Sequence, residues 1–192
     1  MSVTAAQDAP GARPNTATGG NPFVTLVLGG ARSGKSSYAE ADVLARGLNC
    51  LYLATSEAFD GEMEERIARH RERRGSEWTT IEEPLALAEV LAAESDPKRA
   101  ILVDCLTLWL ANLLGAEREI AAEFEKLVGV LSNVGGPVVL VSNEVGQGIV
   151  PDNALARRFR DEAGRLHQQI AAVAGRVVFV TAGLPQTLKD IR

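Results

Sequence analysis

The sequence predicts an α/β protein in which a mainly parallel sheet is flanked by helices. From residue 23 onward, short apolar runs alternate with longer amphipathic segments, which is typical of this class. The apolar runs are nearly continuous in Val, Ile and Leu, as in strands that are covered on both faces. The 192 residues, of which 46% are hydrophobic, suffice for one domain with a sizeable core. We expect a single domain over residues 23–192.

Six segments are predicted as strands. Five of them are apolar and should be inner strands: residues 23–28, 50–55, 100–105, 137–143 and 176–182. The segment 78–83 is more polar, so we expect it to be short and near an edge of the sheet.

Helical spacing of apolar residues predicts six helices between these strands. They cover residues 35–46, 61–74, 85–94, 106–114, 117–132 and 153–174. The last is the longest, and its apolar residues recur at threes and fours as one stripe. The stripe consists of Ala154, Leu155, Phe159, Ala163, Leu166, Ile170 and Val173.

Residues 1–22 are rich in Ala, Gly, Pro, Thr and Asn and hold no apolar core of the kind that a signal peptide needs, so we expect a disordered tail. The sequence contains no run of 18 or more apolar residues, so we expect no membrane-spanning helix. The cytoplasm is the expected compartment. A net charge of −5 gives no general attraction to nucleic acid or anionic membranes. Cys50 and Cys105 lack the spacing of a metal or redox pair, so buried reduced thiols are expected.

A phosphate-binding loop is predicted over residues 29–36, which read GGARSGKS. They satisfy the pattern G-x-x-x-x-G-K-[ST] directly after an apolar strand and directly before a helix. The glycines allow a tight turn, and backbone N–H groups and the helix N-terminus then face the phosphates. We expect Lys35 to reach the β- and γ-phosphates and Ser36 to bind Mg²⁺.

Asp104 is the last residue of the segment AILVD, directly after four apolar residues. Aspartate at a strand end is also common for reasons of local turn structure. Together with the phosphate loop, however, this position suits the acid that holds Mg²⁺, often through water. We therefore predict that Ser36 and Asp104 are the metal-binding residues.

His70 lies in the segment ERIARHRERRG, among five arginines within nine residues. On a helix, Arg66, His70 and Arg74 share one face. The arginines form a local anion site suited to a triphosphate. They also disfavour the imidazolium, so His70 should stay neutral and nucleophilic. We hypothesise that His70 attacks phosphorus covalently; His167, the other histidine, is expected to be structural.

The segments GGARSGKSSYAE, LYLATSEAFDGEMEERIARHRERRGSEWTTIEEP, VDCLTLWLANLL and VSNEVGQGIVPDNALARRFRDEAGRLHQQIA resemble a known family. This is the bifunctional adenosylcobinamide kinase/adenosylcobinamide-phosphate guanylyltransferase family of cobalamin biosynthesis. The likeness covers nearly everything from residue 23 to 188, in the family's order and spacing. Two features depart from the family pattern: the N-terminal tail, and His167 in place of an expected Asn.

The resemblance implies an enzyme with a RecA-like P-loop fold that acts in two steps. The first phosphorylates the aminopropanol hydroxyl of adenosylcobinamide with ATP or GTP. The second transfers GMP from GTP to that phosphate, giving adenosylcobinamide-GDP and pyrophosphate. By the match, His70 carries GMP covalently, and the assembly is expected to be a homotrimer. The nucleotide contacts fall on Gly29, Gly30, Ala31, Arg32, Ser33, Gly34, Lys35, Ser36, Ala54, Thr55, Ser56, Arg71, Glu72, Arg73, Arg74, Glu82 and Asp104.

Three alternatives stay open at this stage. In the first, the chain is a different small-molecule P-loop kinase in which His70 has no catalytic role. In the second, it is a P-loop ATPase that acts through partners such as nucleic acid. In the third, it is a family member that has lost one of the two activities. The acidic pI of about 5.2 and the 5% aromatic content argue against nucleic acid as a partner. No residue is a clear general base for the kinase step, although Asp104 or Glu82 is available, and a loose phosphoryl-transfer transition state needs little help from a base.

Overall fold

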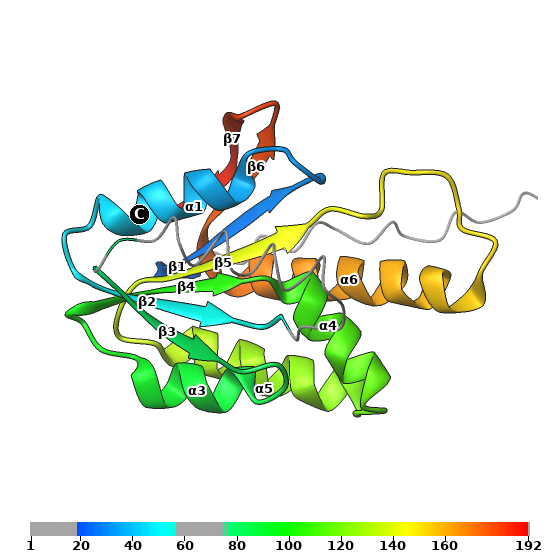
Figure 1. Ribbon diagram of the computed structural model, residues 1–192, viewed down its shortest axis with the longest axis horizontal. Helices are drawn as coiled ribbons and strands as arrows, with labels where there is room; N and C mark the ends of the chain where they lie inside the picture. Colours follow the sequence, from blue (N-terminus) through cyan, green and yellow to red (C-terminus); the bar gives the residue numbers. More distant parts are fainter. Residues whose placement is uncertain (1–18, 57–74, 76, 192) are drawn as a thin grey trace, which may run out of the picture.

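The computed structural model describes residues 19–56, 75 and 77–191. Within them a seven-stranded sheet with the order β3-β2-β4-β5-β1-β6-β7 is flanked by helices (Figure 1). The strands are β1 (Asn21–Gly29), β2 (Asn49–Ala54), β3 (Trp78–Glu82), β4 (Arg99–Asp104), β5 (Val138–Asn143), β6 (Ala174–Thr181) and β7 (Leu184–Asp190). The helices are α1 (Lys35–Leu44), α3 (Leu87–Glu94), α4 (Leu106–Gly115), α5 (Ile120–Asn133) and α6 (Ala154–Val173).

Strands β1 to β6 run parallel to one another, which confirms the predicted fold class. The polar strand β3 lies at one edge, as its composition predicts. β1 begins at Asn21, two residues before the predicted start of the domain. The predicted helix over residues 61–74 lies outside the described residues.

β7 was not predicted. It pairs antiparallel with β6 and forms the other edge of the sheet. Ala182 and Gly183 connect the two strands, and both have positive φ angles, of 52° and 79°. This is the backbone of a tight two-residue hairpin turn. β6 therefore ends at Thr181, one residue before the predicted end of that strand.

Helices cover the two faces of the sheet unequally (Figure 1). Among the described helices, α1 packs on one face, whereas α3, α4, α5 and α6 pack on the other. Neighbouring strand residues face opposite layers: Leu26 and Leu28 belong to the larger apolar cluster, and Val27 belongs to the smaller one. Each near-continuous apolar strand thus contributes alternate side chains to the two apolar clusters, one on each face of the sheet.

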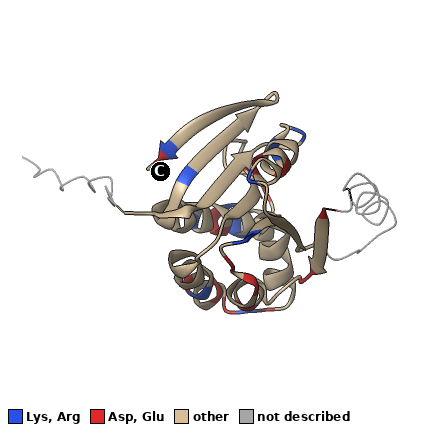
Figure 2. Ribbon diagram, turned by 90° about the vertical axis from the view of Figure 1, so that its left-hand side faces the viewer, with Lys and Arg blue, Asp and Glu red and all other residues tan. Residues whose placement is uncertain are grey.

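Charged residues occur mainly on the helices and connecting segments, whereas the central strands are uncharged along most of their length (Figure 2). Cys50 and Cys105 are buried free thiols, as predicted. None of the helices in the described ranges is long and apolar enough to cross a membrane.

Candidate functional site

Four predicted site residues are brought to the carboxyl edge of the sheet. Gly29 ends β1, Ala54 ends β2, Glu82 ends β3 and Asp104 ends β4. Ala54 pairs in register with Glu82 on one side and with Asp104 on the other. In open α/β sheets, this edge is where ligands bind.

The phosphate loop curls between β1 and α1. Its first turn is closed by Ser33 N–H, which donates to the Gly30 carbonyl at 3.3 Å. The first backbone bond of α1 runs from Tyr38 N–H to the Gly34 carbonyl at 3.0 Å, and no side chain caps the helix. The N–H groups of its first turn are therefore placed as in helix N-termini that bind anions.

Lys35 is the first residue of α1 and is only 9% exposed. Its Nζ donates to the Gly30 carbonyl at 3.2 Å, which folds the side chain back over the phosphate loop. An ammonium group has three N–H donors, and this contact uses one of them. A positive charge is thus held within the curve of the loop.

Glycine is required at two points of the loop. A Cβ at Gly29 would lie 2.5 Å from both the Ser33 hydroxyl and the Val180 carbonyl oxygen. Gly34 has a φ of 94°, and its Cβ would lie 3.1 Å from the Cα of Gly183. Gly183 N–H also donates to the Ser33 carbonyl at 2.7 Å. The β6–β7 turn therefore supports the phosphate loop, a contact that sequence reasoning missed.

Asp104 lies partly exposed at the end of β4. The Tyr52 hydroxyl donates to its Oδ2 at 2.9 Å and fixes the orientation of the carboxylate. The peptide bond to Cys105 is cis. Burial raises the pKa of the Cys105 thiol, as does the charge of Asp104, while Lys35 lowers it. Asp104 ends β4 and Lys35 begins α1 after the loop that follows β1, so both lie at the carboxyl edge of the sheet.

A carboxylate and a hydroxyl are oxygen donors of the kind that Mg²⁺ prefers, so Asp104 and Ser36 fit this ion. No cluster of three or more His, Cys, Asp or Glu side chains that could hold a metal occurs among the described residues. Mg²⁺ bound to nucleotides commonly uses one or two protein ligands, with phosphates and water supplying the rest. Asp104 and Ser36 would be such ligands.

Thr55 is fully buried beneath the site. Its hydroxyl donates to the Cys105 carbonyl at 2.7 Å and accepts from Cys105 N–H at 2.9 Å. The side chain thereby fixes the ends of β2 and β4 to each other. Ser56, the next residue, is partly exposed.

Helix α4 is hydrogen-bonded to the segments that follow two strands and to the end of a third. Asn112 Nδ2 donates to the carbonyl oxygens of Thr55 at 2.7 Å and Pro84 at 3.1 Å. The Thr107 hydroxyl accepts from Asn143 Nδ2 at 2.8 Å. The segments after β2 and β3 and the end of β5 are thus tied to one helix, which sequence reasoning did not identify.

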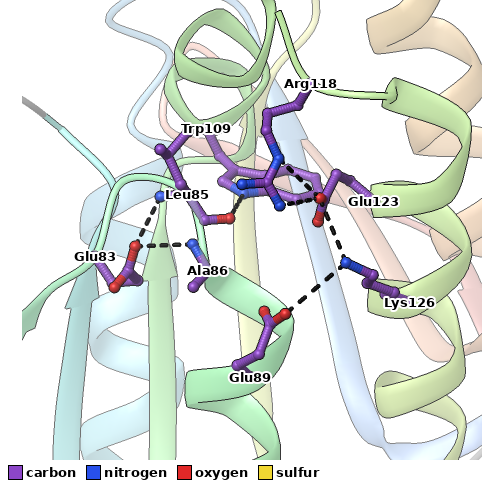
Figure 3. A network of polar contacts seen from close by, with 8 residues as sticks. All are labelled: Glu83, Leu85, Ala86, Glu89, Trp109, Arg118, Glu123 and Lys126. Atoms are coloured by element: carbon purple, nitrogen blue, oxygen red, sulfur yellow. Dashed lines mark hydrogen bonds and ion pairs between the residues drawn. The ribbon is translucent and has the colours of Figure 1, made fainter. Parts of the chain in front are cut away.

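Figure 3 shows how α4 is itself anchored. Trp109 is fully buried, and its Nε1–H donates to the Leu85 carbonyl at 2.9 Å. Close by, the buried Glu123 carboxylate accepts from Arg118 and Lys126. Burial raises the pKa of Glu123, but these two cations more than offset it, so the pKa lies below its ordinary value. The carboxylate therefore stays charged and paired at neutral pH.

His167 is buried in α6, where its Nε2 lies 2.7 Å from the Ser142 hydroxyl. Its Nδ1 lies 3.8 Å from Oε2 of Glu144, a residue whose N–H donates to the Gly29 carbonyl. Burial lowers the pKa of His167 below its ordinary value of 6.5, although Glu144 partly raises it. The side chain is a neutral packing residue, which agrees with its predicted structural role.

We expect His167 to make the protein sensitive to mild acid. Because its pKa is lower in the folded chain, the unfolded chain binds a proton first as the pH falls below about 6.5. The free energy of unfolding should therefore fall with pH from that point. Urea unfolding between pH 8 and 5 should show a shallower fall for His167→Gln than for the wild type. Equal slopes would show that His167 titrates alike in both states.

The remaining predicted site residues cannot be placed. His70, Arg71, Glu72, Arg73 and Arg74 lie outside the described residues. Their proposed roles rest on the sequence.

Comparison with known proteins identifies the family. A family model described as cobinamide kinase / cobinamide phosphate guanyltransferase matches residues 25–188. The chain belongs to this family. It is therefore an enzyme of the cobinamide kinase/guanylyltransferase type, with the nucleotide-binding P-loop of a cobalamin biosynthesis protein.

Curated members of the family match over almost their full length. The bifunctional adenosylcobalamin biosynthesis protein CobP of Pseudomonas aeruginosa is 53% identical over 166 residues, covering 85% of this chain and 96% of its own. The protein of the same description, CobU, of Escherichia coli K12 is 41% identical over 182 residues, covering 87% of this chain and 100% of its own.

Among solved structures, the flagellar accessory protein FlaH of Methanocaldococcus jannaschii has a similar fold, with a TM-score of 0.50. It is 11% identical, and the match covers 90% of this chain and 80% of FlaH. At this identity the likeness concerns the fold alone. The mainly parallel sheet and the loop between β1 and α1 agree with the fold class predicted from the sequence.

Proposed function

We propose that the enzyme phosphorylates the aminopropanol hydroxyl of adenosylcobinamide and then transfers GMP from GTP onto that phosphate. The products are adenosylcobinamide-GDP and pyrophosphate. The observation that supports this most strongly is the position of Lys35 and Asp104 at one sheet edge, in a chain that matches the family from residue 25 to 188. One nucleotide site would serve both steps.

In the kinase step, the phosphates of ATP or GTP bind in the loop over residues 29–36. The N–H groups at the start of α1 and the Lys35 ammonium stabilise the charge that develops on the γ-phosphoryl group. Ser36 and Asp104 would hold Mg²⁺, which neutralises phosphate charge when bound. The acceptor hydroxyl attacks Pγ, its proton leaves to solvent or a nearby carboxylate, and the nucleoside diphosphate departs.

In the guanylyl step, a neutral imidazole nitrogen of His70 attacks Pα of GTP. The bond from Pα to the β-phosphate oxygen breaks, and pyrophosphate leaves. A phosphate oxygen of the acceptor then attacks the same phosphorus, which breaks the P–N bond and restores the free imidazole. We propose that Arg71, Arg73 and Arg74 pair with the triphosphate and that Glu72 lies beside them at the nucleotide.

Further residues complete the proposed site. Ala54, Ser56 and Glu82 would border the nucleotide at the ends of β2 and β3. Thr55 would support them from within the fold, because it is fully buried and its hydroxyl is bonded to Cys105. The proposal also includes one domain from Asn21 onward and a homotrimer in the cytoplasm, where ATP and GTP are available. Light scattering would measure the oligomeric state.

Product analysis tests the proposed function. Purified protein with adenosylcobinamide, Mg²⁺ and ATP should give only the phosphate, detected by chromatography and mass spectrometry. Addition of GTP should convert it to adenosylcobinamide-GDP with one pyrophosphate per product. Phosphorylation without conversion by GTP would identify a plain kinase, and no reaction of adenosylcobinamide in either mixture would reject the proposal.

A further inference from the structure

An apolar groove of about 710 Å³ lies between α4, the segment 144–153 and the first turns of α6. Apolar side chains form most of its walls, among them Leu114, Val145, Pro151, Leu155 and Phe159. Asn153 and Arg160 add polar groups. The Arg160 guanidinium is paired with Asp161 at 3.0 Å, so the groove does not carry an unbalanced positive charge there.

The groove begins at the same sheet edge as the phosphate loop. Glu144 N–H donates to the Gly29 carbonyl at 3.0 Å, and the next residue, Val145, lines the groove. On the other wall, α4 starts two residues after Asp104 and reaches the groove at Ala111. Five residues of helix span about 8 Å. A molecule in the groove therefore lies close enough to extend an arm to a bound nucleotide.

The apolar stripe of α6 continues past the sheet. Ala163, Leu166 and Ile170 are buried against it, as a core helix requires. The first turns of the helix reach beyond the strands, and the segment before them projects from the end of β5 (Figure 1). Leu155 is 62% exposed there. The predicted stripe is thus divided into a core half and a half that borders the groove.

The segment before α6 adds further exposed apolar surface. Ile149 is 97% exposed and Val150 is 60% exposed. Both directly precede Pro151, which lines the groove together with the exposed Leu155. Gathered apolar exposure of this kind marks a surface that binds something, unlike single exposed residues.

We propose that this groove binds the corrin macrocycle of the acceptor substrate. The inference rests on the proposed function, because only that reaction supplies a corrinoid acceptor. The acceptor hydroxyl must reach the phosphate loop on a short arm, while the macrocycle stays beside it. A macrocycle with hydrocarbon faces and neutral amide arms suits these apolar walls. The Oδ1 of Asn153 caps α6, and its Nδ2 is the group that can donate to an amide carbonyl. The groove volume also lies within the range of about 300–1,000 Å³ that is usual for ligand sites.

Leu155→Asp tests the site, since it places a charge on an exposed wall position without disturbing the core. Leu188→Asp is the matched control, because Leu188 is also exposed, at 57%, but lies on β7 at the far edge of the sheet. The kinase reaction with adenosylcobinamide should show a KM for the corrinoid raised at least about tenfold in Leu155→Asp and unchanged in Leu188→Asp. The KM for ATP should stay within about twofold in both variants.

The outcomes separate the groove from the function. An unchanged corrinoid KM in Leu155→Asp would overturn the proposed binding site while leaving the wild-type reaction intact. Light scattering of both variants excludes another occupant: loss of a wild-type oligomer in Leu155→Asp would show that a second copy covers the groove and would also overturn the proposal. A wild type that does not phosphorylate adenosylcobinamide would instead reject the function itself.

Discussion

Lys35→Met is expected to lower the rates of both proposed steps by at least about 10²–10³-fold. The ammonium group lies buried at the start of α1, 3.2 Å from the Gly30 carbonyl, where it can contact transferring and leaving phosphates alike. Methionine keeps an unbranched apolar side chain in place of the lysine stem and removes the charge. The rates would be measured separately, as phosphate formation from ATP and as adenosylcobinamide-GDP formation from the purified phosphate.

Lys98→Met is the matched control for this prediction. Lys98 is exposed before β4, at the opposite end of the strand from Asp104. Its replacement should leave both rates within about twofold of the wild type. A Lys35→Met protein with an unchanged melting temperature and with either rate within tenfold of the wild type would show that Lys35 does not serve that step.

His70→Ala is expected to separate the two steps. Phosphorylation of adenosylcobinamide should continue within a few-fold of the wild-type rate, because phosphoryl transfer needs no nucleophile from the protein. Formation of adenosylcobinamide-GDP should fall at least about 10³-fold, because the covalent carrier of GMP is lost. Product formation would be followed by mass spectrometry with each donor nucleotide separately.

The control for His70 is the other histidine. His167→Gln retains a hydrogen-bonding group near Ser142 and leaves the proposed nucleophile in place. It should form adenosylcobinamide-GDP at a rate close to that of the wild type at pH 8. Guanylyl transfer by His70→Ala at more than a tenth of the wild-type rate would reject the covalent route through this residue.

The inner strands were predictable because each is a near-continuous apolar run that fills two cores. β7 was missed for the opposite reason. Its sequence, LPQTLKD, is mostly exposed at the edge of the sheet, and its apolar residues do not form a run. Its pairing depends on the positive φ angles of Ala182 and Gly183, and Ala-Gly is a weaker signal for such a turn than Asn-Gly.

The phosphate loop and Asp104 were predictable because their chemistry lies in a few neighbouring residues. The support beneath them was not. Asn112 holds carbonyl groups at Thr55 and Pro84, which are 57 and 28 residues away along the chain. Gly183 meets Ser33 only after β6 has returned to the side of β1. Such contacts depend on topology, which no local pattern in the sequence contains.

The α6 stripe shows a different limit. Its spacing predicted one apolar face, and the spacing is continuous from Ala154 to Val173. The structure buries only the part that lies over the sheet, because the first turns extend past the strand ends. Periodicity reports that a helix face is apolar, but what covers the face depends on how far the neighbouring strands reach.

The most direct test of the two-step chemistry is the intact mass of the protein after incubation with GTP and Mg²⁺, beside His70→Ala. We expect an added mass of one GMP on the wild type, released by acid, stable to alkali and absent from the variant, as for a phosphoramidate on histidine. No added GMP, in protein shown by calorimetry to bind GTP, would contradict the covalent step and leave the loop GGARSGKS serving phosphorylation alone.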